Sequence, residues 1–273
     1  MDILTKFRQA PISVKELKLN IFAPVERKKT EMVEKEILFE DEIFKVELTG
    51  YKLNQTHRDI LDIILFFGDA KIEDIILEDG LPIRAFSLYQ IQKHLNYKSK
   101  KNSKWIRDKF SELKNVTLKI TNKKLKNDIE FSIIRIIKHS EKLGTYVLVM
   151  EELYMAFFKK EISIGYKKLL PIILSLKHAQ TKALIRYILT HTTGIQINID
   201  KALKKIGIKG EKRNIEYYRK LVLDELKEVG KEFNIELIKT TDDNRKKSDI
   251  NIKYTKHKEV KIYHPNKEIS EKV

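Results

Sequence analysis

An amphipathic pattern runs through Asn102-Ser103-Lys104-Trp105-Ile106-Arg107-Asp108-Lys109-Phe110-Ser111-Glu112-Leu113-Lys114-Asn115-Val116. Ile106, Phe110 and Leu113 recur at helical spacing, which predicts one buried face. A second stripe points away from that face and is mainly basic; its members are Lys104, Arg107, Ser111 and Lys114. We therefore predict a short surface helix with a positive outer face.

Two strands are expected directly after this helix. They cover 116–121 and 129–137, and the polar turn between them contains Lys123 and Lys124. A helix followed by a basic β-hairpin is the second half of a winged helix, the helix-turn-helix variant whose hairpin lies beside the DNA backbone. The hairpin over 116–137 is therefore the predicted wing.

Two earlier helices complete this motif. One is predicted over 54–67, where Asn54 or Thr56 can cap its first turn. The other begins at Ser87, which forms a capping box with Gln90 ahead of an apolar run. Three helices and a hairpin in this order predict a complete winged helix in the first half of the chain.

The same pattern returns 113 positions later, where Glu225-Leu226-Lys227-Glu228-Val229 repeats Glu112-Leu113-Lys114-Asn115-Val116. Further matches at this offset are caps and apolar anchors: Ser87 with Asp200, Trp105 with Tyr218, Phe110 with Leu223 and Leu113 with Leu226. Matches over about 30 residues favour an internal duplication. We predict an α+β fold class with two tandem winged-helix domains.

The predicted organisation has three parts: an N-terminal extension over 1–47, partly disordered or docked on a partner, and winged-helix domains over 48–166 and 167–273. In the second domain we expect a long helix over 170–191, a strand over 195–199, a helix over 201–206 capped by Asp200, and a helix over 212–229. A hairpin with strands over 233–239 and 249–255 is expected to follow. The last residues are charged, and we expect them to be frayed.

Composition excludes several classes of protein. The 273 residues include no cysteine, which rules out disulfides, thiolate metal sites and a cysteine nucleophile. The N-terminus lacks the apolar core of a signal peptide, and charges interrupt every apolar run before it reaches membrane-spanning length. These features predict a soluble, cytoplasmic protein.

The net charge of +16 is concentrated in two windows. Residues 93–126 hold twelve lysines and arginines against two acids, and residues 201–231 hold ten against five. Residues 31–47 are acidic instead, with seven acids against two lysines. Positive charge focused on both predicted helix–hairpin units is the electrostatic footprint of a nucleic-acid-binding protein.

No motif for catalysis is present. The chain has no P-loop and no His/Cys spacing typical of a metal site, and we expect His57 and His94 to be ordinary surface histidines. Tyr217-Tyr218 on a basic helix raises the alternative of a DNA-nicking tyrosine, but the histidine pair that would hold such an enzyme's metal is missing. We predict a protein that is no enzyme and binds no metal or cofactor.

The order of segments resembles that of plasmid replication initiators of the TrfA type. The residues that carry the resemblance lie in both halves, at 53–61, 86–89, 105–120, 184–191 and 218–229. It implies a protein that binds origin repeats (iterons) on double-stranded DNA, helps open A+T-rich DNA and recruits the host helicase or initiator and the sliding clamp, with a monomer–dimer equilibrium. One departure is that the clamp-binding pentapeptide of the family is not recognisable, since Glu16-Leu17-Lys18-Leu19 is a poor match.

The resemblance also implies that the second winged helix reads the major groove and the first contacts flanking backbone. Carried over, the base-reading side chains are Arg213, Asn214, Tyr217 and Lys220, and the phosphate contacts include Lys104, Arg107, Lys123 and Lys124. The other predicted DNA-binding residues lie in turns, at one helix start and at the second hairpin tip: Lys100, Lys101, Lys212, Arg245, Lys246 and Lys247. A transcriptional regulator, or a protein-interaction module built from winged helices, stays open as an alternative.

Overall fold

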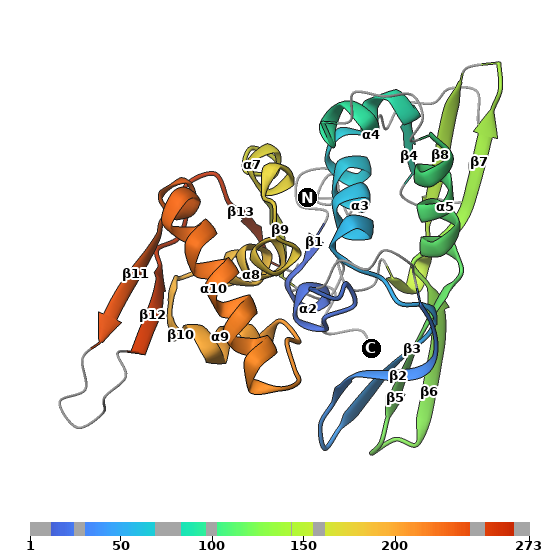
Figure 1. The fold of residues 1–273 in the computed structure, drawn as a ribbon. Helices are drawn as coiled ribbons and strands as arrows, with labels where there is room; N and C mark the ends of the chain where they lie inside the picture. Colours follow the sequence, from blue (N-terminus) through green and yellow to red (C-terminus); the bar gives the residue numbers. More distant parts are fainter. Residues whose placement is uncertain are drawn as a thin grey trace.

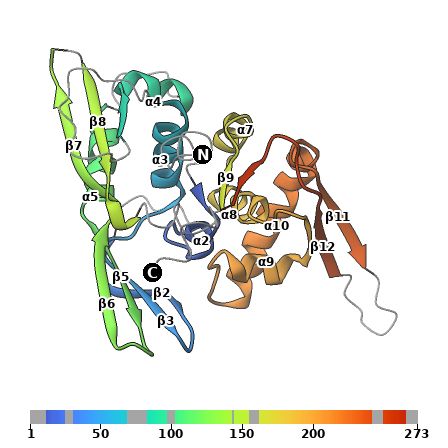
Figure 2. The same ribbon diagram turned by 180° about the vertical axis from the view of Figure 1, so that it is seen from behind.

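Two units of the same kind lie side by side in the computed structural model (Figure 1). The structure describes residues 12–24, 31–68, 83–96, 103–142, 144–154, 162–240 and 249–264. The strand pairs β7–β8 (Ile134–Ser140 and Thr145–Met150) and β11–β12 (Ile235–Thr240 and Asp249–Tyr254) lie at opposite ends of the molecule, as the view from behind also shows (Figure 2).

The first winged helix consists of α3 (Gln55–Phe67), β4 (Ile83–Phe86), α4 (Leu88–His94), α5 (Ser103–Lys114), β7 (Ile134–Ser140) and β8 (Thr145–Met150). Ser87 caps α4 through the predicted capping box with Gln90. Asn54, one of the two candidates for the cap of α3, caps that helix, and it does so through a capping box with His57 that was not predicted. The three strands form a sheet in the order β4-β8-β7.

The second winged helix consists of α8 (Ala179–Leu189), β10 (Ile195–Asn198), α9 (Ile199–Lys205), α10 (Lys212–Val229), β11 (Ile235–Thr240) and β12 (Asp249–Tyr254). Its strand order, β10-β12-β11, is the order of the first sheet with each strand replaced by its counterpart. The predicted α+β fold with two tandem winged helices is therefore confirmed, and the shared topology agrees with internal duplication.

Two details of the second unit differ from prediction. Asn198, and not Asp200, caps α9: its Oδ1 accepts the backbone N–H of Asp200 at 2.9 Å. The helix expected over 170–191 is divided into α7 (Leu170–Ser175) and α8. The break is held by Glu225, a buried residue of α10, whose carboxylate accepts the backbone N–H of Lys177 at 2.6 Å.

The predicted wing of the first unit is wrong. The strand expected over 129–137 is divided at buried Ile133 into β6 (Asn127–Ser132) and β7, which belong to different sheets. β5 (Val116–Asn122) and β6 instead join β2 (Met32–Glu40) and β3 (Phe44–Tyr51) in a sheet of order β2-β3-β5-β6. The true wing is β7–β8, and the hairpin β5–β6 is an insertion between α5 and that wing.

Both ends of the described chain pack beside the connection between the units. β1 (Ile12–Ser13) and β13 (Lys261–Tyr263) pair with opposite edges of β9 (Ser163–Gly165). Helix α2 (Val14–Lys18) follows β1. The described part of the expected N-terminal extension is thus packed, and 261–263 is a strand where we expected a frayed end. The limits of the two domains, after 47 and after 166, stay a prediction.

Each winged helix has its own apolar core. Leu61, Ile106, Phe110 and Leu113 are buried in the first. Leu184, Val222 and Leu226 are buried in the second. In the part of the chain that is described, no helix is long and apolar enough to cross a membrane.

Replacing a core leucine tests this assignment. Leu113 is fully buried, so Leu113→Ala should lower the free energy of unfolding by about 2–5 kcal/mol, because apolar contacts are lost and a cavity remains. Leu125 in the β5–β6 turn is 70% exposed, and Leu125→Ala should change it by less than about 0.5 kcal/mol. Urea unfolding of both variants measures the difference; equal losses would contradict the buried role of Leu113.

Candidate nucleic-acid interface

Helix α10 presents a basic and aromatic stripe. Arg213, Tyr217 and Lys220 are all exposed, with Tyr217 at 59%, and they recur at helical spacing on the side away from the core. We call these three residues the α10 stripe. It combines a guanidinium that can pair with a guanine edge, a phenol and an ammonium on one helix face. The predicted site residues of α10 are brought together here, except Lys212 and Asn214.

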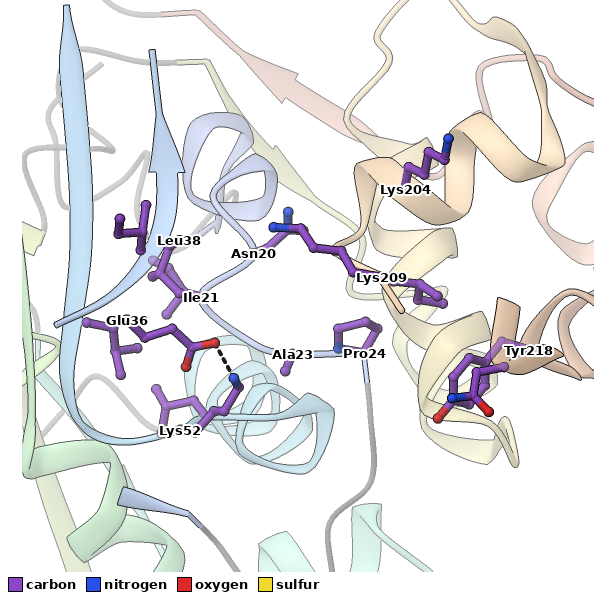
Figure 3. A pocket seen from close by; sticks show the side chains of 16 residues that line it. Asn20, Ile21, Ala23, Pro24, Glu36, Leu38, Lys52, Lys204, Lys209 and Tyr218 are labelled. Carbon is purple, nitrogen blue, oxygen red and sulfur yellow. Dashed lines mark hydrogen bonds and ion pairs between the residues drawn. The ribbon is translucent and has the colours of Figure 1, made fainter. Parts of the chain in front are cut away.

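Asn214 and Lys212 lie off this stripe, although both are exposed. Asn214 and Tyr218 line a cleft of about 370 Å³ between the two units (Figure 3). The opposite side of this cleft includes the β2-β3-β5-β6 sheet, where Glu36 of β2 pairs with Lys52. Asn214 is therefore exposed at the edge of this cleft, and its base-reading role stays a prediction.

Helix α5 presents a second positive stripe. Lys104, Arg107 and Lys114 are exposed on it, while the apolar face predicted from the sequence is buried. Lys109 turns inward instead and donates from Nζ to Glu112 Oε2 at 2.7 Å. Each third helix of a winged helix thus carries exposed cations on its outer face.

His57 is a core residue, so the expectation of a surface histidine is wrong. Its Nδ1 accepts the backbone N–H of Asn54 at 3.1 Å, which leaves Nε2 to donate to Glu112 Oε2 at 2.6 Å. Burial lowers the pKa of His57, and the hydrogen bond to Glu112 offsets only part of this effect. His94 is also less free than expected, because its ring stacks on Phe67 with centroids 4.0 Å apart. His57 therefore ties α3 to α5 in its neutral form.

Lys123 and Lys124 are exposed at the tip of the inserted β5–β6 hairpin, and not on a wing. Lys123 Nζ bonds Glu40 Oε1 at 2.8 Å and the carbonyl of Asp41 at 2.7 Å. The acidic window noted in the sequence therefore lies next to this lysine, and phosphate contact by Lys123 would have to displace Glu40.

The β7–β8 wing carries exposed cations that sequence reasoning missed. They are Arg135, Lys138 and Lys142, together with His139, whose ring stacks on Tyr146 at 4.3 Å. A wing lies beside the phosphate backbone in the helix-turn-helix variants that carry one. The available signal was the glycine turn at Gly144 between two strand-like runs, which marks a hairpin as clearly as the turn at 122–128.

Five predicted DNA-binding residues lie outside the described residues: Lys100, Lys101, Arg245, Lys246 and Lys247. Their roles stay predictions. The same holds for phosphate contacts by Lys104 and Arg107, although the structure places both on the exposed stripe of α5.

Comparison with solved structures supports the fold. The match to one crystal structure of domains 2 and 3 of RctB covers 89% of this chain and 97% of the RctB chain, with a TM-score of 0.60 at 10% sequence identity. The match to a second crystal structure of RctB domains 2–3 covers 87% of this chain and 95% of the RctB chain, with a TM-score of 0.55 at 12% identity. The similarity spans both winged helices and shows a shared fold. No family model and no curated protein matches the sequence.

Acid should weaken the α3–α5 contact through His57. Its folded pKa lies below the ordinary value of 6.5, so the unfolded chain binds more protons as the pH falls below that value. The contribution of His57 is therefore present above pH 6.5 and is lost as the pH falls through its folded pKa. His57→Gln should flatten this part of the stability curve, measured by urea unfolding from pH 7.5 to 5. Parallel curves for both proteins would contradict a buried neutral His57.

Proposed function

We propose that this protein is a replication initiator that binds repeated sites on double-stranded DNA. The observation that carries the proposal is a pair of winged helices, each with exposed cations along the outer face of its third helix. RctB, whose domains 2 and 3 share this fold, is a replication initiator of Vibrio chromosome II. The net charge of +16 supports binding to a polyanion.

In this proposal the two units have different tasks. The α10 stripe reads base edges, because the start of the third helix is where helix-turn-helix proteins reach the major groove. Arg213 pairs with a guanine, and Tyr217 packs against bases or sugar. The first unit offers mainly lysines, which act as point charges on phosphate and carry little sequence information. Lys104, Arg107 and the β7–β8 wing therefore position the protein on DNA.

The finer assignment follows the resemblance to TrfA-type initiators. We infer that the sites are iterons of a plasmid origin, that the host helicase or initiator and the sliding clamp are partners, and that the chain exchanges between monomer and dimer. We also propose that the protein acts without catalysis of its own. A covalent product between Tyr217 and DNA would overturn this last point and favour a nicking mechanism.

Selection of bound sequences from random and plasmid DNA tests the function. Direct repeats at an origin are the expected outcome, whereas promoter palindromes would favour the alternative of a tandem winged-helix transcriptional regulator. Failure to bind any duplex, across a series of salt concentrations, would favour a protein-interaction module. The likeness to RctB favours initiation over both alternatives.

Arg213→Ala should lose specific binding. Removing a bidentate contact to a base should cost about 1–3 kcal/mol on the selected site and much less on random DNA. Lys227→Ala is the control on the same helix, because Lys227 lies about four turns further along and pairs with Asp224 at 2.8 Å. Titration of each variant on both DNAs measures the effect. Equal losses of Arg213→Ala on the two DNAs would mean that α10 does not read sequence.

Lys138→Ala combined with Lys142→Ala should weaken binding to selected and random DNA alike. Each lost phosphate contact should also lower the slope of log affinity against log salt by about 0.9. Lys123→Ala with Lys124→Ala should do the same to a smaller degree, because Lys123 is already paired with Glu40. A salt series on both DNAs compares the two pairs. A larger effect of the Lys123 and Lys124 pair would return the DNA-facing role to the inserted hairpin.

A further inference from the structure

The two winged helices meet through buried ionised side chains. Arg186 of α8, in the second unit, is 2% exposed and reaches α3 of the first. Its Nη2 lies 2.6 Å from Asp59 Oδ1 and 2.9 Å from Asp62 Oδ2, and its Nη1 donates to Gln55 Oε1 at 2.6 Å. One guanidinium thus contacts three consecutive turns of a helix in the other unit.

Asp62 connects this contact to the rest of the junction. Its Oδ2 accepts a hydrogen bond at 2.9 Å from the hydroxyl of Tyr166, the residue that follows β9. Its Oδ1 accepts a hydrogen bond at 2.7 Å from Nε of Arg58. Arg58 in turn pairs with Glu16 of α2. We call the six charged residues of this network the ionic joint: Glu16, Arg58, Asp59, Asp62, Lys182 and Arg186.

The ionic joint is balanced, with three cations and three carboxylates, and all six side chains are at most 11% exposed. Burial alone would lower the pKa of Arg186, but Asp62 and Asp59 outweigh it and the pKa lies above its ordinary value. Buried ion pairs contribute little net stability compared with apolar packing, yet they are costly to break and allow few geometries. Such a joint is suited to fixing an angle.

Beyond the joint, the units separate. The cleft of about 370 Å³ lies between the β2–β3 side of the first unit and the start of α10 in the second (Figure 3). Across it, Asn20 Nδ2 donates to the carbonyl of Lys205 at 3.1 Å, an exposed contact. Apolar side chains also pack at the junction, where Phe66 of α3 belongs to the core of the second unit. Because the cleft lies beyond this packed region, a small rotation at the joint would become a larger displacement at the start of α10.

We propose that Arg186, Asp59 and Asp62 are positioning residues that set the distance between the two third helices and hence the length of DNA that both units contact at once. The proposal rests on the proposed function, because it assumes that both units meet one duplex. Contacts by linked units depend on the span between them, and two recognition helices must match the helical repeat of DNA. An exact joint therefore adds a requirement for spacing that neither unit has alone.

The first test measures geometry without DNA. The chain has no cysteine, so Tyr89→Cys on α4 and Glu228→Cys on α10 would be the sole sites for spin labels; both positions are exposed. We expect a narrow distance distribution in the parent chain and a broader or shifted one in Arg186→Met. Arg186→Lys keeps the positive charge but loses the planar guanidinium that donates to several acceptors at once. This variant should stay folded, and its distance distribution should also be broader or shifted.

Arg219→Lys is the matched control. Arg219 pairs with Asp200 at 3.6 Å inside the second unit, so this change should leave the distance distribution unaltered. Asp59→Asn, which keeps the shape of the side chain, should broaden the distribution as Arg186→Lys does. Unchanged distributions in both Arg186→Lys and Asp59→Asn would overturn the proposal, whatever the DNA experiments show.

The second test uses the selected DNA. The parent chain should protect one continuous stretch, and Arg186→Lys should keep protection of the part read by α10 while protection of the flanking part weakens roughly tenfold or more. Uniform loss across the stretch would overturn the positioning role. If no chain binds DNA but the distances still broaden, the proposed function fails while the ionic joint keeps its role in setting the angle.

Discussion

The arrangement of this protein depends on the pairing of Arg186 with Asp59 and Asp62 across the junction of two units. Charged groups removed from water need partners at short distance and correct angle, because an unpaired buried charge costs several kcal/mol. The same network includes Glu16 and Arg58, so it joins α2 to α3 and α8, the first helices of the two winged helices. The connection between the units is flanked there by β1 and β13, which brings both ends of the described chain to the same junction.

The two winged helices share their topology but differ in what surrounds the third helix. In the first unit α5 has 12 residues and is followed by the inserted β5–β6 hairpin, whose sheet brings an acidic strand close to the basic turn at Lys123. In the second unit α10 has 18 residues and is followed, after a 3-10 turn over Gly230–Phe233, by the wing β11–β12 with no inserted hairpin. The longer helix, α10, is the one with an exposed tyrosine between basic side chains on its outer face, which agrees with a division between reading and positioning.

Prediction from sequence was most accurate where structure depends on neighbours along the chain. Asn54 and Ser87 cap helices because their side chains bond N–H groups two or three residues away. The outer face of α10 follows from periodicity alone. The wing was assigned wrongly because β6 and β7 form one continuous strand-like run, and only their partners, β5 and β8, place them in different sheets.

The sequence by itself determined the fold class, the repeat, the three-helix pattern of each unit and the positive faces of α5 and α10, since all of these depend on local spacing and charge. Tertiary structure decided which hairpin is the wing, that His57 is buried against Glu112, and that Asn214 lines a cleft. It also decided that Asp59, Asp62 and Arg186 meet. Residues 59 and 186 lie 127 positions apart, and no periodicity indicates which charged side chain of a helix finds its partner in another unit.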